Sequence, residues 1–382
     1  MSDVMTYDME IAELDQTFDM ELDAAIIAGG GSITLPENCT QDLSWNAIAP
    51  RVDTSGVKNM ARMFYQVYPA QGFSPDFSSW DTSQVEDMSY MFYGCNNADF
   101  NPIISSWDVR KVKNMSYMFD NCYSAAFNPD LSAWQTDALE SMKYLFYRCY
   151  GAAFNPNIGN LNTSHVADMT YVFYGCNSAI FNPDLSDWDT GEVTTMACMF
   201  YGCNGAAFNP DMSDWNVEKV TSMSAMFQNC YGAAFNPDLH KWDTGEVTDF
   251  NSMFSGCYGA NFNPNVKGWD TSKATSFNSM FTGCNGAAFN PDLDGWDTSS
   301  ATNMYSIFGN IATITHKKIW VPKSFVATGV AVNRNKPFYN SPGAQKADVY
   351  TDATDAASQG WGTPNANFVM HYNSTHDDFL NA

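Results

Sequence analysis

Cysteines have the widest chemical range of any residue in this sequence, because a thiol can form a disulfide, bind a metal or act as a nucleophile. Eight of the ten cysteines recur every 27 residues, at Cys95, Cys122, Cys149, Cys176, Cys203, Cys230, Cys257 and Cys284. Cysteines at one position of stacked repeats point the same way, which is poor geometry for a disulfide, and metal sites need clustered ligands. We therefore expect buried free thiols packed as small apolar groups, and we expect Cys39 and Cys198 to be reduced as well.

Aspartates form two further columns. One follows a tryptophan, at Asp81, Asp108, Asp189, Asp243, Asp270 and Asp297, and the other follows a proline, at Asp76, Asp130, Asp184, Asp211, Asp238 and Asp292. Ladders of carboxylates can bind calcium, and paired carboxylates can hydrolyse glycosides. Helix capping and turn formation explain both columns without metal or catalysis. The sequence thus predicts no metal, cofactor or catalytic residue and leaves calcium binding open.

Histidines give little support for an enzyme. The five are scattered, at His165, His240, His316, His371 and His376. No Ser-His-Asp or phosphate-loop motif accompanies them, and the stretch from His371 to Asp377 is the only local group of possible ligands. A carbohydrate-active enzyme would need a deep pocket and a carboxylate with a perturbed pKa. We expect a protein that is not an enzyme.

The elements that position these residues follow one 27-residue repeat. Tryptophan keeps this register over eight steps of 27 residues, at Trp80, Trp107, Trp134, Trp188, Trp215, Trp242, Trp269 and Trp296, with Leu161 at the remaining position. Met-Phe pairs such as Met199-Phe200 and Phe-Asn-Pro triplets such as those at Phe208 and Phe235 keep the same step. A spacing with no insertion requires a stack of near-identical coils.

Within one unit, the apolar spacing predicts a helix. Val193, Met196, Met199, Phe200 and Cys203 would form one stripe of a helix about three turns long, with an N-cap just before it at residues 189 to 190.

A short strand is expected next in each unit. Ala206 and Phe208 alternate as an inward-facing strand would, and Pro210 would end that strand. The predicted fold class is α/β, a leucine-rich-repeat solenoid of about nine coils over residues 51–310. Its strands would form a parallel sheet on one face, and its helices would cover the other face.

The repeat resembles a known family. The segment WDTGEVTTMACMFYGCNGAAFNPDMSDW, residues 188 to 215, closely resembles the BspA-like leucine-rich repeats of bacterial surface proteins. The resemblance covers about residues 50 to 310, and residues 311–382 look like the capping region that closes such arrays. It implies adhesion to host or partner molecules, which would meet positions between the repeated columns. We expect exposed aromatics at Tyr123, Tyr150, Tyr231 and Tyr258.

The first 50 residues differ from the repeat. Between residues 5 and 26, apolar residues alternate with acidic ones in two runs, which predicts a β-hairpin. A lone hairpin is marginal in water, so residues 1–50 are interpreted as an acidic segment for attachment or oligomerisation. The opening MTYDMEIAELDQTFDMELDAAIIAGGG also resembles the N-terminal segment of phage virion structural proteins.

The net charge of the chain excludes some classes of binding partner. The chain has 18 Lys and Arg against 42 Asp and Glu, a net charge of −24, which repels nucleic acid and anionic lipid. No apolar stretch is long enough to span a bilayer, and residues 1 to 50 contain no Lys or Arg, unlike a secretory signal.

The functional expectation is a phage virion-surface protein, in a fibre, tail or capsid decoration, that adheres to a host-surface protein or glycan. It would bind other virion proteins through its N-terminal segment and form a homo-oligomer, with no nucleic acid partner and no membrane insertion. The alternatives are a BspA-like adhesin on the bacterial cell surface and a purely structural virion component.

Overall fold

Backbone amides in each repeat divide between two kinds of acceptor. The amide of Tyr90 donates to the carbonyl of Ser116, one coil further along the chain, at 2.9 Å. The next amide, of Met91, donates three residues back to the carbonyl of Met88 at 3.2 Å. This alternation continues to Cys95 and recurs at the equivalent residues of the following coils. Every second residue therefore ties a coil to its neighbour, and the residues between close four-residue turns.

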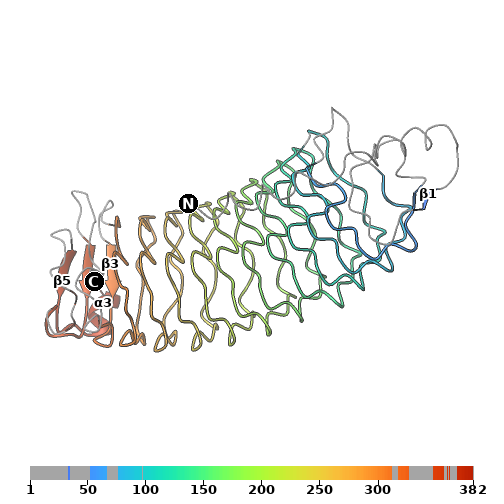
Figure 1. Cartoon of the computed structure of the whole chain (residues 1–382). Coiled ribbons are helices and arrows are strands. Elements are labelled where there is room, and N and C mark those ends of the chain that lie inside the picture. Colours follow the sequence, from blue (N-terminus) through green and yellow to red (C-terminus); the bar gives the residue numbers. More distant parts are fainter. Residues whose placement is uncertain are drawn as a thin grey trace, which may run out of the picture.

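The resulting architecture is an elongated, curved stack of coils (Figure 1). The computed structural model describes residues 33–34, 52–66, 76–96, 98–311, 317–326, 347–356, 359, 361 and 368–381. The predicted hairpin at residues 5–26, Cys39 and His316 lie outside these residues. Within the described ranges, no helix has the length and hydrophobicity needed to cross a bilayer.

Short strands mark the two ends of the stack. At one end, β1 (Ile33–Thr34) pairs in parallel with β2 (Val52–Asp53). At the other, β3 (Lys317–Trp320), β4 (Ala347–Tyr350) and β5 (Phe368–His371) form a parallel sheet in the order β3-β4-β5. Helix α3 (His376–Asn381) packs on β3 and β4. This sheet continues the parallel pairing of the coils, since Trp320 of β3 forms a parallel bridge with Asp292.

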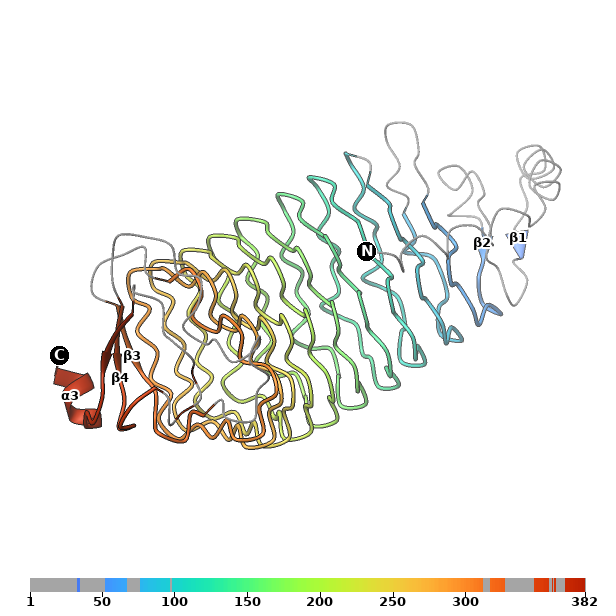
Figure 2. The ribbon, with the colours of Figure 1, turned by 60° about the vertical axis from the view of Figure 1, so that its left-hand side comes forward.

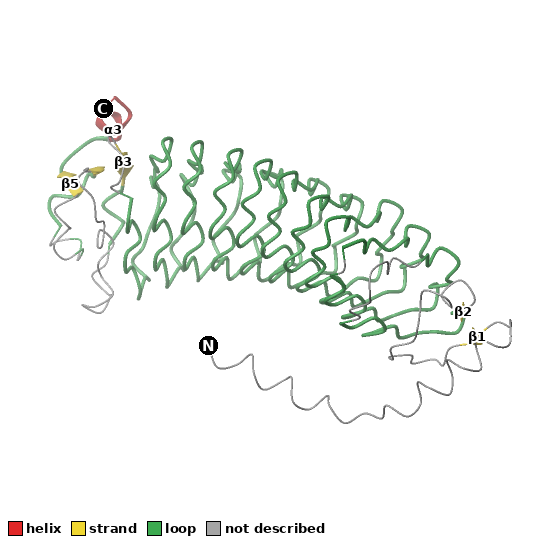
Figure 3. Ribbon diagram, turned by 90° about the horizontal axis from the view of Figure 1, so that it is seen from above, coloured by secondary structure: helices red, strands yellow, loops and turns green. Residues whose placement is uncertain are grey.

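The predicted helix in each coil is wrong. In the part of the chain that the structure describes, α3 is the only α-helix, and the coils between β2 and β3 are drawn as loop (Figure 3). Each coil instead has two left-handed residues four positions apart, for example Cys198 with φ of 55° and Gly202 with φ of 72°. Such a residue fits the third position of a type II turn and not an α-helix. The apolar spacing of three that suggested a helix also fits consecutive turns that return inward every three residues.

The predicted strand at Ala206 and Phe208 is also wrong, since Ala206 and Ala207 form a turn and Phe208 lies in no strand. Phe208 is buried as expected, but Ala206 is exposed. Parallel pairing within the array is reduced to single-residue bridges. Most of them lie in the coil segment where the helix was expected, for example Thr195 with Ser222, and two lie after the Phe-Asn-Pro segment, at Asp76 with Ile103 and Asp292 with Trp320. Near the predicted strand, asparagines tie the coils together: the amide of Asn209 donates to Oδ1 of Asn182 at 2.8 Å. The coils therefore have neither the continuous sheet nor the helical layer that the sequence suggested.

Figure 2 shows the coils stacked one on another. Ladders of buried aromatic side chains form the core between the two sides of each coil. Phe200 and Phe227 stack with ring centroids 5.7 Å apart, and Trp215 and Trp242 stack at 6.4 Å. Burying such a ring contributes about 2 kcal/mol. The indole Nε1 of Trp242 also donates to the Met212 carbonyl at 3.0 Å. The tryptophan column therefore joins neighbouring coils through both its ring and its N–H.

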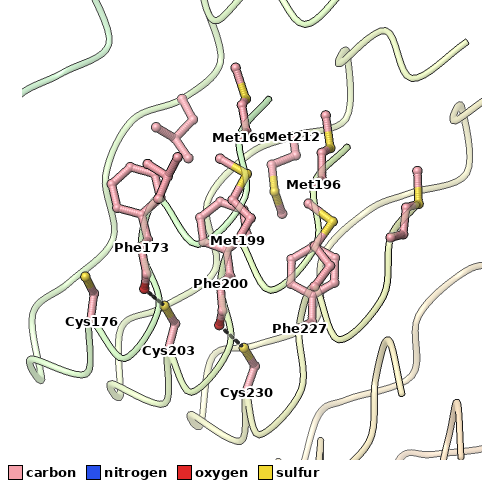
Figure 4. Packing of buried hydrophobic residues seen from close by; sticks show 14 of the residues in the cluster. Met169, Phe173, Cys176, Met196, Met199, Phe200, Cys203, Met212, Phe227 and Cys230 are labelled. Atoms are coloured by element: carbon pink, nitrogen blue, oxygen red, sulfur yellow. Dashed lines mark hydrogen bonds between the residues drawn. The ribbon is translucent and has the colours of Figure 1, made fainter. Parts of the chain in front are cut away.

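The cysteine column consists of buried free thiols, as predicted. Figure 4 shows the thiol of Cys203 pointing at the carbonyl of Phe173, to which it donates at 3.0 Å. Burial raises the pKa of Cys203 well above its usual value. Cysteine is thus both a small apolar group and a hydrogen-bond donor to the preceding coil.

Burial of the thiols gives a first testable prediction. In the native protein at mildly alkaline pH, iodoacetamide should alkylate Cys203 and Cys230 at least about a hundredfold more slowly than after denaturation, because a buried protonated thiol is a poor nucleophile. Half-buried Cys198 should react before them, although burial also raises its pKa. Mass spectrometry of the labelled peptides measures each site. Rapid native labelling of the column would contradict the packing.

Candidate binding face

Tyrosines gather on one side of the array in two columns. One column occupies the first of the two left-handed positions of each coil. The other column lies three residues further along the chain. Together they are Tyr65, Tyr90, Tyr93, Tyr117, Tyr144, Tyr147, Tyr171, Tyr174 and Tyr201, which we call the tyrosine face. Tyr117 stacks on Tyr144 with ring centroids 4.3 Å apart, and Tyr174 stacks on Tyr201 at 4.5 Å. All nine side chains are partly exposed.

The tyrosine face is confined to the first half of the array. In later coils the first column continues as Cys198, Ala225, Ser252, Ser279 and Ser306, and the second as Gln228, Ser255, Thr282 and Gly309. The buried core columns and the backbone turns continue through these later coils. Since the coils keep these contacts with serine or alanine at the outward position, coil packing alone does not require the tyrosines.

The phenols of this face keep their protons at physiological pH. Burial is the main cause that raises the pKa of Tyr144, Tyr171 and Tyr174 to about 12. Burial, followed by the neighbouring Tyr90 and Tyr144, raises the pKa of Tyr117 still further. The face therefore offers neutral hydroxyl groups, each of which can donate and accept hydrogen bonds.

A buried acid interrupts the second tyrosine column. Asp120 stands where the neighbouring coils have Tyr93 and Tyr147, and it is only 4% exposed. Its Oδ1 accepts a hydrogen bond from Nδ2 of Asn121 at 2.6 Å. Burial raises the pKa of Asp120 to about 8, against the opposing effect of the positive charge of Arg148. At neutral pH this carboxyl is mostly protonated, so it adds little negative charge to the face.

Two arginines lie on the tyrosine rings. The guanidinium carbon of Arg62 is 5.8 Å from the ring centroid of Tyr65 and 5.1 Å from that of Tyr90. The guanidinium of Arg148 lies 5.1 Å from the ring of Tyr147. These distances are in the range of cation–π interactions. Both arginine side chains are exposed, so their planar donor groups remain accessible on the aromatic surface.

The four tyrosines expected to be exposed are exposed, with fractions of 36 to 46%. They form two stacked pairs, Tyr123 with Tyr150 and Tyr231 with Tyr258, at 5.0 Å and 4.4 Å. The larger tyrosine face escaped sequence reasoning, although its signal was present: tyrosine flanks the Met-Phe pair on both sides in YMFYGC at Tyr90 to Cys95 and changes to other residues in later coils.

Both aspartate columns close turns. Oδ1 of Asp189 accepts from the amide of Gly191 at 3.0 Å, and Oδ1 of Asp211 accepts from the amide of Ser213 at 3.0 Å. The other members of the two columns accept from the residue two positions later in the same way. The predicted turn role is confirmed, while the predicted capping of a helix is wrong because these coils contain none.

The histidines do not converge on one site. His371 Nε2 lies 2.8 Å from Asp348 Oδ1 in the terminal sheet, and His376 Nε2 lies 2.8 Å from Asp292 Oδ2 in the last coils. His240 pairs with Asp238, and His165 is exposed. No group of three or more potential metal ligands occurs among the residues that the structure describes. The two histidines of the His371 to Asp377 stretch therefore contact different carboxylates.

A pocket of about 320 Å³ lies beside Trp107, and its lining includes Asp108, Arg110 and Gln135. Asp108 forms a close ion pair with Arg110, whose hydrogen bond lowers the pKa of the carboxyl. A general acid for glycoside hydrolysis needs a raised pKa, and the acid with such a pKa, Asp120, does not line this pocket. The pocket lacks the acid and base pair that the enzyme alternative requires.

Comparison with known proteins gives one match. A family model described as "Mycoplasma protein of unknown function, DUF285" matches four overlapping segments, residues 37–152, 124–233, 148–260 and 205–320. No curated protein and no solved structure matches the chain. The four matches together span the whole coil array, and the chain belongs to the DUF285 family.

Proposed function

We propose that the chain is a non-enzymatic binding protein whose coil array presents the tyrosine face to a protein or glycan on a host surface. The observation that carries this proposal is the confinement of the face to residues 65 to 201, on a backbone that repeats without it in later coils. Tyrosine provides a large, rigid contact area with a polar end and is enriched in binding surfaces. The aspartates and cysteines are already engaged in turns and core contacts.

We further propose that the array is a leucine-rich-repeat type of solenoid in which turns replace the helices, carried on the surface of a phage virion. The resemblance of the repeats to BspA-like surface proteins and of residues 5 to 31 to virion proteins supports this proposal. Residues 1–50 would bind other virion proteins and form a homo-oligomer. A bacterial cell-surface adhesin and a purely structural virion component remain the alternatives.

Replacing tyrosines of the face tests the binding role. The double variant Tyr117→Ser and Tyr144→Ser should bind host cells at least about tenfold more weakly, since tyrosine contacts in an interface commonly cost about 1 kcal/mol or more each when truncated. Serine stands at this column in Ser252 and Ser279 with the same left-handed backbone, so folding should survive. Cell binding by flow cytometry and circular dichroism measure the two properties.

The matched control is Tyr231→Ser with Tyr258→Ser, which removes an equal number of exposed tyrosines outside the face. Cell binding of this control should remain within about twofold of the unmodified protein. Equal binding by both double variants would contradict a role for the tyrosine face. Absence of cell binding in the unmodified protein would favour the structural alternative.

A further inference from the structure

Most cations of the array are neutralised by a neighbouring coil. Lys113 pairs with Glu86 at 2.8 Å, and Lys219 pairs with Glu192 at 2.7 Å, each across one coil step. The same holds for the pairs Lys143–Asp168, Lys241–Asp214 and Lys273–Glu246. Arg110 pairs with Asp108 in its own coil. These exposed cations offer little unbalanced charge to a partner, because a carboxylate already lies beside each of them.

Arg62 and Arg148 are different. Neither forms an ion pair with any described residue; each guanidinium lies on tyrosine rings instead. Asp120, whose carboxyl senses the charge of Arg148, is buried. Arg62 and Arg148 thus place two positive charges on the tyrosine face of a molecule with a net charge of −24. An arginine that packs on an aromatic ring, and has no ion-pair partner among the described residues, can receive a carboxylate with two parallel hydrogen bonds.

The groups between these arginines suit a sugar chain. The two arginines stand three coil steps apart, roughly 14 Å at the usual spacing of strands. The intervening surface carries the partly exposed phenols of Tyr93, Tyr117 and Tyr144 and the partly exposed amide of Asn121. These uncharged donors and acceptors match the hydroxyl and acetamido groups of sugars. A densely charged polyanion would be repelled by the acidic remainder of the protein.

Resting on the adhesive function proposed above, we propose that the tyrosine face binds a glycan whose carboxylates are spaced along a mostly neutral chain. Arg62 and Arg148 each bind a carboxylate of this glycan. The tyrosine hydroxyls and Asn121 bind the neutral sugars between them. The proposed partner is thus an acidic glycan, and binding to a surface protein instead is the competing result of the test below.

The test measures binding of the full chain by calorimetry to oligosaccharides of hyaluronate, in which an acidic sugar alternates with a neutral one. Polysialate and polygalacturonate, which carry a carboxylate on every sugar, serve as densely charged comparators. The expected result is saturable binding to hyaluronate that weakens about tenfold or more, about 1.4 kcal/mol, in the double variant Arg62→Ser and Arg148→Asn. Both replacements occur at left-handed positions of the same columns, as Ser252 and Asn121, so the backbone should persist. Chemical reduction of the glycan carboxyls to alcohols should have a comparable effect.

Arg110→Ser provides the matched control, because it removes an arginine that is already paired with Asp108 and should leave binding within about twofold. Failure to bind hyaluronate, equal binding by the double variant, or tighter binding to polysialate, polygalacturonate or densely sulfated heparin would overturn the inference. Cell binding separates this failure from failure of the proposed function. If the tyrosine variants lose cell binding while no acidic glycan binds, adhesion stands and the glycan assignment falls.

Discussion

Replacing Gly232 with alanine is expected to destabilise the array by about 3 kcal/mol, near the upper end of what overpacking usually costs. A Cβ at this position would lie 2.1 Å from the carbonyl oxygen of Gly205 in the preceding coil and 3.1 Å from its carbonyl carbon. Both atoms belong to the backbone, so no side chain can rotate away. The coils would have to separate locally, which would stretch the contacts that join them. Urea denaturation followed by circular dichroism measures the loss.

A matched control is Gly56→Ala, where nothing lies within 4 Å of the new methyl group; it should change stability by less than about 0.5 kcal/mol. The equivalent position in two other coils is a serine, Ser124 or Ser178, so some coils accommodate a Cβ there. Gly151 and Gly205 follow those serines, and a methyl group there would also meet the serine carbonyls at 1.9 and 2.0 Å. If Gly232→Ala unfolds at the same urea concentration as the unmodified protein, this close approach does not constrain the array.

The coil period and the identity of the core could be read from the sequence because both depend on side-chain type. Each repeated Trp, Phe, Met and Cys is buried as expected, since stacking places every copy of a column in the same surroundings. The turn role of the aspartates was accessible for the same reason: an Asx turn is a local interaction of two residues. Burial and local hydrogen bonds that recur in every repeat can therefore be predicted from the sequence.

The backbone path could not be read in this way. Apolar residues at Val193, Met196 and Met199 fit a helix of about 3.6 residues per turn and fit successive turns of three equally well over so short a segment. The deciding feature is the left-handed conformation of residues such as Tyr90 and Ser252, whose types give no signal for it. Their backbone cost is offset by hydrogen bonds to the next coil, a tertiary effect that local propensity does not contain.

The candidate face was missed because sequence analysis assigned repeated residues to the core and looked for ligands between the columns. The tyrosines occupy repeated positions, yet they point outward and repeat only in the first half. Comparing the variable residues of each column along the array would have found them. Asp120 would have appeared in that comparison as the acid that replaces one tyrosine.

Asp120 is expected to make the stability of the array fall as pH rises. Its pKa is about 8 in the folded protein against about 3.9 in an unfolded chain, so the folded state binds the proton more tightly. The stabilisation linked to this proton is fully present below about pH 4. It is lost progressively as the pH rises through about 8, and the total is on the order of 5 kcal/mol.

Asp120→Asn should remove this dependence, because the amide keeps the shape of the side chain and cannot ionise. Between about pH 5 and pH 9 the free energy of unfolding of the unmodified protein should fall relative to this variant, and the variant should be the more stable of the two proteins at about pH 9. Asp187→Asn, which removes an exposed carboxyl, controls for the change in net charge. Urea denaturation at each pH gives the difference in free energy of unfolding between the unmodified protein and Asp120→Asn. The contributions of all other titrating groups cancel in this difference. Parallel pH profiles for the unmodified protein and Asp120→Asn would show that Asp120 is ionised in the folded state, and the tyrosine face would then carry a negative charge beside Arg148.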